Sequence, residues 1–549
     1  MKTILSIVFL SCWIGLQGQS KLVFSYEKHL EEIPMVHPSQ KQTLINSKLM
    51  DLWSRGFLYS GVDSVAQDTV YLHLGNRLAG EVSSLRLFNQ DEDEFENIPV
   101  GKSEELEVLL RKTLNEYSDS GHPFVQIKLR EIDIDHDAFT AAVEVYPGPV
   151  VRFDSIALLG DVGIGRKFLA RALEVESGKL YSEQIYRDIP YHIQRLPFLS
   201  LESPTDITFS EGKTTIYLNL KERKENSFEG VVGLLPRQSA EEKLAITGYL
   251  DLGLTNLFKS GKSLNFTWNR FADESQSVDL AYYHPYFLST PLFVGVEFDL
   301  LKQDTSFLTQ RWLLQTGAFI GKRSEITMSY ESANGSLINP EELDIAKGVA
   351  DYKSGLYSLG FGSSFYARPL ILKNQIKYHV RTGLGEKRIV RNPSVQPESY
   401  DTLMRNSRLV KLSGGFKYLF RFTDRLALFH QMEGELFFNN QVLLNELTRV
   451  GGLRTVRGFN ENFFYAQHYA FSRLEMRQYF ERSSYFMAFY DQLIYRGLGS
   501  EAAPTGFGLG LTLDTSNGLF TFATAMGYSS NIPLDPNNIK IHLGYTSRF

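Results

Sequence analysis

The chain has 549 residues, which is too long for one ordinary domain and predicts at least two. Its 57 basic and 63 acidic residues give a net charge of −6, which argues against nucleic acid as a partner, because nucleic-acid binding needs a clustered basic surface. Aromatic residues make up 13% of the chain and glycines number 43, a composition that suits a β-barrel whose surface is only half apolar.

The N-terminal segment is typical of an export signal. The short apolar run Ile4–Leu16 passes into the small-residue stretch Gly15–Ser20, so residues 1–20 are predicted to be a secretory signal peptide. The only cysteine, Cys12, lies inside this segment, and we expect the mature chain to carry no thiol. Lipidation at Cys12 is the weaker alternative, because the apolar run continues past the cysteine. No later segment has the roughly 18 continuous apolar residues of a membrane helix.

Between residues 21 and 225, helical and strand periods alternate in a repeated order. The predicted elements are helix Gln40–Arg55 with strands Phe57–Val65 and Thr69–Leu74; helix Ser103–Tyr117 with strands Phe124–Ile134 and Phe139–Tyr146; and strand Val151–Leu158 with helix Ser182–Leu196 and strands Asp206–Phe209 and Thr214–Leu220. We predict three small α+β units at residues 21–80 (the faintest), 81–148 and 149–225. One irregular α+β domain is the alternative.

Residues 226–549 show strand periodicity only. In the last segment Ile541, Leu543 and Tyr545 alternate with His542 and Gly544, as expected where one face is apolar and the other lines a wet lumen. A soluble sandwich would show the same period, but single sandwiches seldom reach 324 residues (549 − 226 + 1). At roughly 20 residues per strand and turn, this span predicts a transmembrane β-barrel of about 16 antiparallel strands, which must close because backbone groups in lipid need partners.

The segment Val450–Phe464 places Arg457 between turn-permissive glycines and predicts a loop that folds back into the barrel. A guanidinium in a lumen needs paired acceptors, because an unpartnered charge that is partly removed from water costs several kcal/mol. Asp491 and Glu475 fall at lumen-facing positions of later strands and are the candidate acceptors. We expect Gly458 to allow a close approach to the wall, with Phe459 packed beside it. A solvated loop arginine is the alternative.

Glycine recurs at every second position in Gly506, Gly508 and Gly510, which lacks the spacing of a dinucleotide-binding loop and instead leaves room on the lumen face. The chain has no HExxH or GxSxG motif, and its histidines are scattered. We therefore expect no catalytic residues, no enzyme activity, no metal and no cofactor.

Several segments, in order along the chain, resemble the BamA/TamA superfamily of outer-membrane assembly and translocation proteins. They are EVYPGPVVRFDSIALLG (Glu144–Gly160), GLTNLFKSGKSL (Gly253–Leu264), HPYFLSTPL (His284–Leu292), RVGGLRTVRGF (Arg449–Phe459), MAFYDQL (Met487–Leu493), GFGLGLTLDTSNGLF (Gly506–Phe520) and the terminal aromatic strand. One departure is Leu493, where family members often have glycine.

The resemblance implies POTRA repeats in the periplasm before a barrel in the outer membrane of a Gram-negative bacterium. It implies that the loop arginine braces the C-terminal wall and that Leu543, Tyr545 and Phe549 form a terminal signal read during insertion. It also implies a lateral seam, where the first strand, near Phe228–Leu235, meets the last, Ile539–Phe549.

The function expected from the resemblance is assembly, insertion or translocation of unfolded outer-membrane or secreted polypeptides. Extended clients would add to exposed edges of the POTRA sheets. One alternative is a TamA-like component that works with an inner-membrane-anchored partner in autotransporter or lipid traffic; another is a two-partner secretion pore. The expected partners are outer-membrane lipid, polypeptide clients and, in some of these readings, an inner-membrane-anchored partner or assembly lipoproteins.

Overall fold

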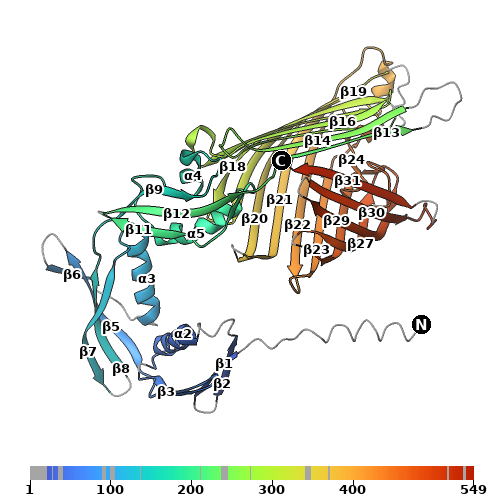
Figure 1. The fold of residues 1–549 in the computed structure, drawn as a ribbon. Coiled ribbons are helices and arrows are strands. Elements are labelled where there is room, and N and C mark those ends of the chain that lie inside the picture. Colours follow the sequence, from blue (N-terminus) through green and yellow to red (C-terminus); the bar gives the residue numbers. More distant parts are fainter. Residues whose placement is uncertain are drawn as a thin grey trace, which may run out of the picture. The chain divides into compact units, whose positions relative to one another are not determined.

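The computed structural model describes most of the chain (Figure 1). The described residues are 21–26, 29–34, 41–57, 59–89, 94–98, 106–135, 138–210, 212–235, 245–272, 274–339, 348–368, 371–481, 483–515, 518–535 and 539–548. The predicted signal peptide, residues 1–20, lies outside them, as does Phe549.

The chain divides into two compact units. The first comprises the residues up to Phe153 with Gly178–Tyr186 and Phe209–Thr214, and the second comprises Asp154–Ser177, Arg187–Thr208 and the chain from Thr215 onward. Among the described residues, no helix is long and apolar enough to cross a membrane.

The first unit begins with a four-stranded sheet packed against one helix, in the strand order β2-β1-β4-β3. Its elements are β1 (Lys21–Tyr26), β2 (His29–Pro34), α2 (Lys41–Ser54), β3 (Gly61–Ala66) and β4 (Thr69–His73). Leu22, Phe24 and Val70 from the sheet share a buried core with Ile45 and Leu52 of the helix.

Two features of this sheet differ from the sequence prediction. The hairpin of β1 and β2 is not predicted, because its alternation is too short to stand out. The third strand begins at Gly61 rather than Phe57, because Gly56 takes a left-handed conformation (φ 91°) and ends α2, with the Phe57 N–H donating to the carbonyl of Leu52.

A second four-stranded sheet follows, in the order β6-β5-β8-β7. Its elements are β5 (Ala79–Asn89), β6 (Glu94–Ile98), α3 (Leu106–Asp119), β7 (Gln126–Asp135) and β8 (Ala138–Tyr146). The predicted helix and the two later strands are present, whereas the β5–β6 hairpin is a further element that the sequence analysis misses. In the first sheet β2 pairs with the outer edge of β1, and in the second sheet β6 pairs with the outer edge of β5. The strands at the opposite edges of the two sheets are β3 and β7.

A third sheet has the strand order β10-β12-β11, and β9 also pairs with β12. The elements are β9 (Arg152–Leu159), α4 (Arg166–Ala172), α5 (Glu183–Gln194), β10 (Leu199–Leu201), β11 (Asp206–Ser210) and β12 (Lys213–Glu222). The predicted helix at Ser182–Leu196 corresponds to α5, whose Ile189 and Ile193 are buried.

The rest of the chain forms a closed antiparallel barrel of 16 long strands, which confirms the predicted strand number. The strands are β13 (Ser227–Leu235), β14 (Ala245–Leu257), β15 (Lys262–Ala272), β16 (Ser275–His284), β17 (Leu292–Gln303), β18 (Phe307–Ile320), β19 (Ser324–Leu337), β20 (Tyr352–Arg368), β21 (Ile371–Ile389), β22 (Asn406–Arg421), β23 (Leu426–Phe438), β26 (His468–Tyr479), β27 (Tyr485–Arg496), β29 (Thr505–Thr515), β30 (Gly518–Tyr528) and β31 (Lys540–Arg548). The two-residue strand β28 (Glu501–Ala502) extends the sheet beside β27.

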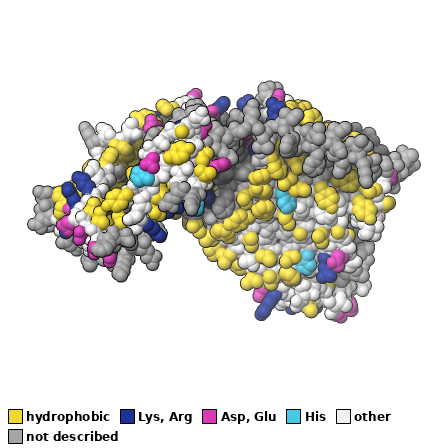
Figure 2. Space-filling view, turned by 90° about the horizontal axis from the view of Figure 1, so that it is seen from below, with side chains coloured by type: hydrophobic (Ala, Val, Ile, Leu, Met, Phe, Trp, Pro, Cys, Tyr) yellow, Lys and Arg dark blue, Asp and Glu magenta, His cyan; other side chains and the backbone are white. Residues whose placement is uncertain are grey.

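Side chains alternate between the outer face of the barrel and its lumen. Trp312 and Tyr357 are exposed on the outside, whereas Arg311 pairs with Asp299 and Glu331 on the inside. Figure 2 shows hydrophobic side chains spread over the barrel wall on the visible face, with few charged ones among them. This is the pattern of a sheet that meets an apolar medium outside and water inside.

The connections at the end of the barrel where β13 begins are short, and most of those at the opposite end are longer, apart from the tight turns between β15 and β16 and between β17 and β18. Within the second unit, the α4–α5 region contacts the short turns. The Lys322 ammonium donates to Asp188 (2.7 Å) and lies over the ring of Tyr191 (4.9 Å), and the Asn256 amide donates to the carbonyl of Gly163 (2.8 Å). The pre-barrel segments that belong to the second unit, Asp154–Ser177 and Arg187–Thr208, therefore contact the barrel at the end with the short turns.

The barrel closes through a narrow contact between its first and last strands, which we call the seam. Only two residue pairs join β13 to β31 in the described ladder, Ser227 with Arg548 and Phe228 with Ser547. By comparison, β13 pairs with β14 from Ser227 to Leu235. Among the ladders between neighbouring long strands in the described part of the chain, the seam thus has the fewest residue pairs.

Candidate functional site: the internal loop and the seam

The candidate site is the loop between β24 (Thr448–Val450) and β25 (Phe464–Ala466), two short strands that pair with each other at its base. We call residues 451–463 the internal loop. Gly451 and Gly452 have φ values of 137° and 94°, which most side chains would disfavour, and they turn the chain immediately after β24.

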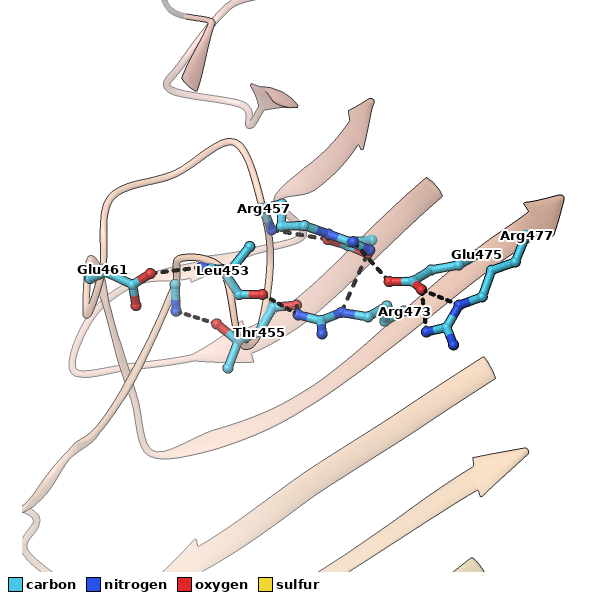
Figure 3. Close-up of polar contacts among 9 residues, drawn as sticks. Leu453, Thr455, Arg457, Glu461, Arg473, Glu475 and Arg477 are labelled. Carbon is cyan, nitrogen blue, oxygen red and sulfur yellow. Dashed lines mark hydrogen bonds and ion pairs between the residues drawn. The ribbon is translucent and has the colours of Figure 1, made fainter. Parts of the chain in front are cut away.

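Hydrogen bonds within the internal loop hold its shape. The Gly452 N–H donates to the carbonyl of Val456 (3.1 Å), and the Gly451 N–H donates to the hydroxyl of Thr455 (2.8 Å). The carboxylate of Glu461 accepts from the Leu453 N–H (2.7 Å) across the loop (Figure 3). The loop therefore presents its arginines from a defined backbone.

Arg457 is buried against the C-terminal part of the wall. Its Nε and Nη2 donate to the two carboxylate oxygens of Asp491 on β27 (both 2.7 Å), and its Nη1 donates to Glu475 on β26 (2.8 Å). Its backbone N–H also donates to Asp491 (3.0 Å). Arg457, Asp491 and Glu475 are only 2%, 1% and 4% exposed, so the structure brings together the three charged residues singled out in the sequence.

The surrounding side chains complete a charged cluster (Figure 3). Arg477 donates to the second oxygen of Glu475 (2.6 and 2.9 Å), and Arg473 donates to the carbonyls of Leu453 (2.6 Å) and Thr455. The Arg457 guanidinium also lies over the Phe489 ring, 3.6 Å from its centre. Fork-shaped, charge-assisted bonds of this kind both strengthen and orient the contact.

A floor of glycines lets the internal loop lie flat on the wall. A Cβ on Gly506 of β29 would lie 1.8 Å from the carbonyl oxygen of Arg457, and a Cβ on Gly527 of β30 would lie 2.6 Å from that of Gly458. Gly458 itself has a φ of 93°, and a Cβ there would meet the Gly527 nitrogen at 2.6 Å. Each of these clashes involves backbone, which side-chain movement cannot relieve.

Phe459 extends the contact as an apolar anchor. It is buried in a cluster with Val450, Val456, Phe464 and Leu493. Leu493 stands where the resembled family often has glycine, and here it fills the core beneath the loop. A glycine at this position would remove that packing.

The internal loop also reaches across the seam to the other side of the barrel. The Arg454 guanidinium donates to Asp251 (3.0 Å) and to the hydroxyl of Tyr249, both on β14. The side chain of Arg454 remains 66% exposed, unlike that of Arg457. The loop is therefore anchored firmly to β26 and β27 and only lightly to β14.

Beside the internal loop lies a lumen cavity of about 840 Å³. Its lining includes Glu229 of β13, Tyr249 of β14, His542 of β31 and Arg454, so it adjoins the inner side of the seam. Glu229 accepts a hydrogen bond from the hydroxyl of Thr546 (3.1 Å), a side-chain contact across the seam. Among the described residues, no group of three or more His, Cys, Asp or Glu side chains could hold a metal ion.

The residues of the predicted terminal signal lie on or beyond the last strand. Leu543 lies opposite Phe522 in β31, and Tyr545 is partly exposed on the outer face, where its ring lies 4.3 Å from that of Phe520. Phe549 lies outside the described residues. Their reading by an assembly machinery stays a prediction.

Sequence reasoning missed Arg454, Gly527 and Arg477 as parts of this site. Arg477 could have been found, because it shares the strand parity of Glu475 on β26. Gly527 lies opposite Gly506 in the ladder of β29 and β30, so its side faces the lumen as that of Gly506 does. The contact of Arg454 with β14 could not be found, because it depends on how the barrel closes.

We predict that Arg457→Ala destabilises the barrel by about 3–5 kcal/mol, because it leaves two buried carboxylates without their shared cation. The measurement is the unfolding midpoint of the purified protein in detergent, followed by circular dichroism and by the shift between folded and unfolded bands on gels. Arg496→Ala is the control, because Arg496 pairs with Glu501 on the exposed surface. Equal shifts for both variants would contradict a bracing role.

We also predict that Gly506→Ala and Gly527→Ala lift the internal loop, since overpacking against backbone costs about 1–3 kcal/mol. Val456 is fully buried, so a Val456→Cys reporter in a Cys12→Ser background should react slowly with a small thiol reagent. Either glycine variant should speed that reaction about tenfold. The control Gly230→Ala, whose Cβ meets nothing closer than 3.6 Å, should leave the reaction rate unchanged. An unchanged rate in the Gly506 and Gly527 variants as well would show that these glycines do not hold the loop against the wall.

No family model and no curated protein sequence matches the chain. Among solved structures, CdiB from Escherichia coli matches with a TM-score of 0.55 at 14% identity, over 94% of this chain and 100% of that one. CdiB from Acinetobacter baumannii matches with a TM-score of 0.53 at 14% identity, over 93% and 97%. BamA from Haemophilus ducreyi lacking POTRA domains 1–3 matches at 0.43 and 14% identity, over 84% and 97%. The likeness to CdiB over nearly the whole of both chains shows that this chain has the fold of those proteins.

Proposed function

We propose that this protein is a member of the BamA/TamA superfamily that inserts or translocates polypeptides at the outer membrane of a Gram-negative bacterium. The observation that carries the proposal is the seam, where two residue pairs close a barrel whose other long strands pair along most of their length. The blocks at 21–80, 81–148 and 149–225 act as POTRA repeats on the periplasmic side. Short periplasmic turns and longer outer loops are typical of outer-membrane barrels and favour this orientation.

A weakly paired seam suits a machine that handles β-strands. Backbone groups in lipid must be paired, so an inserting strand needs a template that satisfies its hydrogen bonds at once. Most of β13 beyond Phe228 has no partner on its seam side in the described ladder, so its backbone can pair with a client strand. The client would enter the membrane without exposing unpaired backbone to lipid.

The small sheets supply further templates for clients or partner proteins. The outer strands β3 and β7 each have an edge that pairs with no other described strand. On β7, Ile132 and Ile134 are exposed, and on β3 Val62 and Val65 are. Main-chain pairing at such an edge gives affinity, and alternate side chains give selectivity. Assembly lipoproteins or an inner-membrane-anchored partner are candidates for the same edges.

The internal loop gives the seam a controlled resistance to opening. Buried Arg457 keeps the loop on β26 and β27, whereas Arg454 is 66% exposed and its partner Asp251 is 26% exposed, and a solvent-accessible ion pair is worth only about 1 kcal/mol or less. Opening the seam would therefore break the contact with β14 first and leave the loop on the C-terminal wall. We propose that this weak pair is a latch.

A secretion pore is the second candidate function, favoured by the lumen cavity of about 840 Å³, whose lining includes Asp299, Arg311 and Glu331. In that case a client would pass through the lumen and displace the internal loop. The seam would then stay closed, so locking it distinguishes the two functions.

We predict that a disulfide across the seam stops insertion. Continuing the register of Phe228 with Ser547 places residue 232 opposite residue 543, so the cysteines are Val232→Cys and Leu543→Cys. In vesicles that contain the oxidised protein, folding of an added unfolded barrel protein should fall about tenfold and recover with a reductant, because the template strand is occupied.

The control pair is Leu314→Cys with Tyr330→Cys, which face each other in the fully paired ladder of β18 and β19. This disulfide should leave insertion unchanged. Undiminished insertion by the seam-locked protein would rule out the lateral route, and continued export of a secreted client by the same protein would support the pore.

We predict that Arg454→Gln increases the separated fraction of the seam about threefold, because it removes the solvent-accessible ion pair with Asp251. Spin labels at positions 232 and 543 report that fraction through their distance distribution. Arg454→Asp should have at least the same effect, and the exchange Arg454→Asp with Asp251→Arg should reverse it. A latch is excluded if the exchange fails to restore the closed distance in a barrel that is otherwise folded.

A further inference from the structure

The outer face of the barrel carries a row of cationic and amide side chains across four adjacent strands. At the end with the long loops, Asn334 of β19, Lys353 of β20, Arg388 of β21 and Asn406 of β22 stand side by side in the ladder. We call these four residues the donor row. It contains two positive charges and no carboxylate.

The two cations point outward. Their chain neighbours Tyr352 and Lys387 are buried on the lumen side, so alternation directs Lys353 and Arg388 to the outer face, where both are exposed. The contrast within β21 is informative. Inward Lys387 donates to the carboxylate of Glu446 (2.6 Å), whereas the structure shows no ion pair for Arg388 among the described residues.

Lys353 and Arg388 are direct cross-strand partners. Side chains in that relation have Cβ atoms about 4.5–5.5 Å apart, and like charges there destabilise a sheet. The nearest outward acid in the ladder is Glu386, which lies opposite Arg408 one row further down. The donor row thus holds an unfavourable pair of positive charges that an external anion would neutralise.

The position of the donor row indicates which anion it meets. Two rows down, still on the outer face, lie Tyr357, which is 71% exposed, and Leu384. Tyr357 stacks with Tyr330 of β19, their ring centres 4.8 Å apart. An aromatic pair at the edge of the apolar wall marks the interface level, and at about 3.4 Å per residue the donor row lies roughly 14 Å further along the tilted strands, on the side of the long loops.

We infer that the donor row binds the phosphate groups of an anionic glycolipid in the outer leaflet of the membrane. Lysine and arginine supply charge, and the two asparagine amides supply neutral donors beside them. The acyl chains of the lipid would lie on the exposed apolar side chains below. The inference rests on the proposed location in an outer membrane and not on the proposed handling of polypeptides.

The test uses the purified full-length mature protein and bisphosphorylated lipid A as the probe. Native mass spectrometry counts the lipid molecules retained after the protein is mixed with lipid A, with the same lipid lacking both phosphates, or with zwitterionic phosphatidylethanolamine. We expect preferential retention of the phosphorylated form. Arg388→Gln should lower that retention about fivefold, and Lys353→Gln with Arg388→Gln should bring it to the level of the zwitterionic lipid, because each cation near an anionic lipid surface is worth about 1 kcal/mol.

Arg496→Gln is the matched control, because Arg496 is an exposed arginine near the same end whose charge is paired with Glu501. It should retain lipid A as the unmodified protein does.

Inorganic phosphate at millimolar concentration should compete only weakly, which separates a lipid site from one for free phosphate. The inference is overturned if the double variant still binds lipid A normally while folded on gels, or if the phosphate-free lipid binds equally well. Failure of client insertion with intact lipid binding would count against the proposed function alone.

Discussion

The bonds of one guanidinium to two carboxylates organise the interior of this barrel. Arg457, Asp491 and Glu475 are almost completely removed from solvent, and none could stay charged there alone without a cost of several kcal/mol. Their mutual bonds offset that cost and fix the internal loop on β26 and β27. The position of Phe459 in its core and the reach of Arg454 toward β14 both follow from that anchor.

The same anchor makes the two sides of the seam unequal. On the C-terminal side, the wall is reinforced from within by the loop, the charged cluster and the apolar core around Phe459. On the N-terminal side, β13 is held by its ladder with β14, by two residue pairs to β31 and by the hydrogen bond from Thr546 to Glu229, and the pair of Arg454 and Asp251 joins β14 to the loop. A force that separates the seam would therefore move β13 while the braced wall stays in place.

Much of this arrangement could be predicted from the sequence, because the alternation along a strand tells which side chains face the lumen and which face outward. Parity places Asp491 and Glu475 in the lumen, and the length of the region gives the 16 strands. The β1–β2 and β5–β6 hairpins could not be predicted, because their strands are short and pair along edges that no periodicity reveals. The contact of Arg454 with Asp251 joins residues 203 positions apart across a closure whose register only the folded barrel defines.

The glycine floor has a consequence for how the gene can vary. The backbone contact at positions 458, 506 and 527 is possible only because none of these residues has a Cβ atom. Every missense change in the three codons would add a side chain, so none can be conservative. Selection on the loop should therefore fall on codons that specify no side chain at all, as strictly as on the codon for Arg457. A comparison of natural variants that scores only charged or catalytic side chains would overlook this backbone contact.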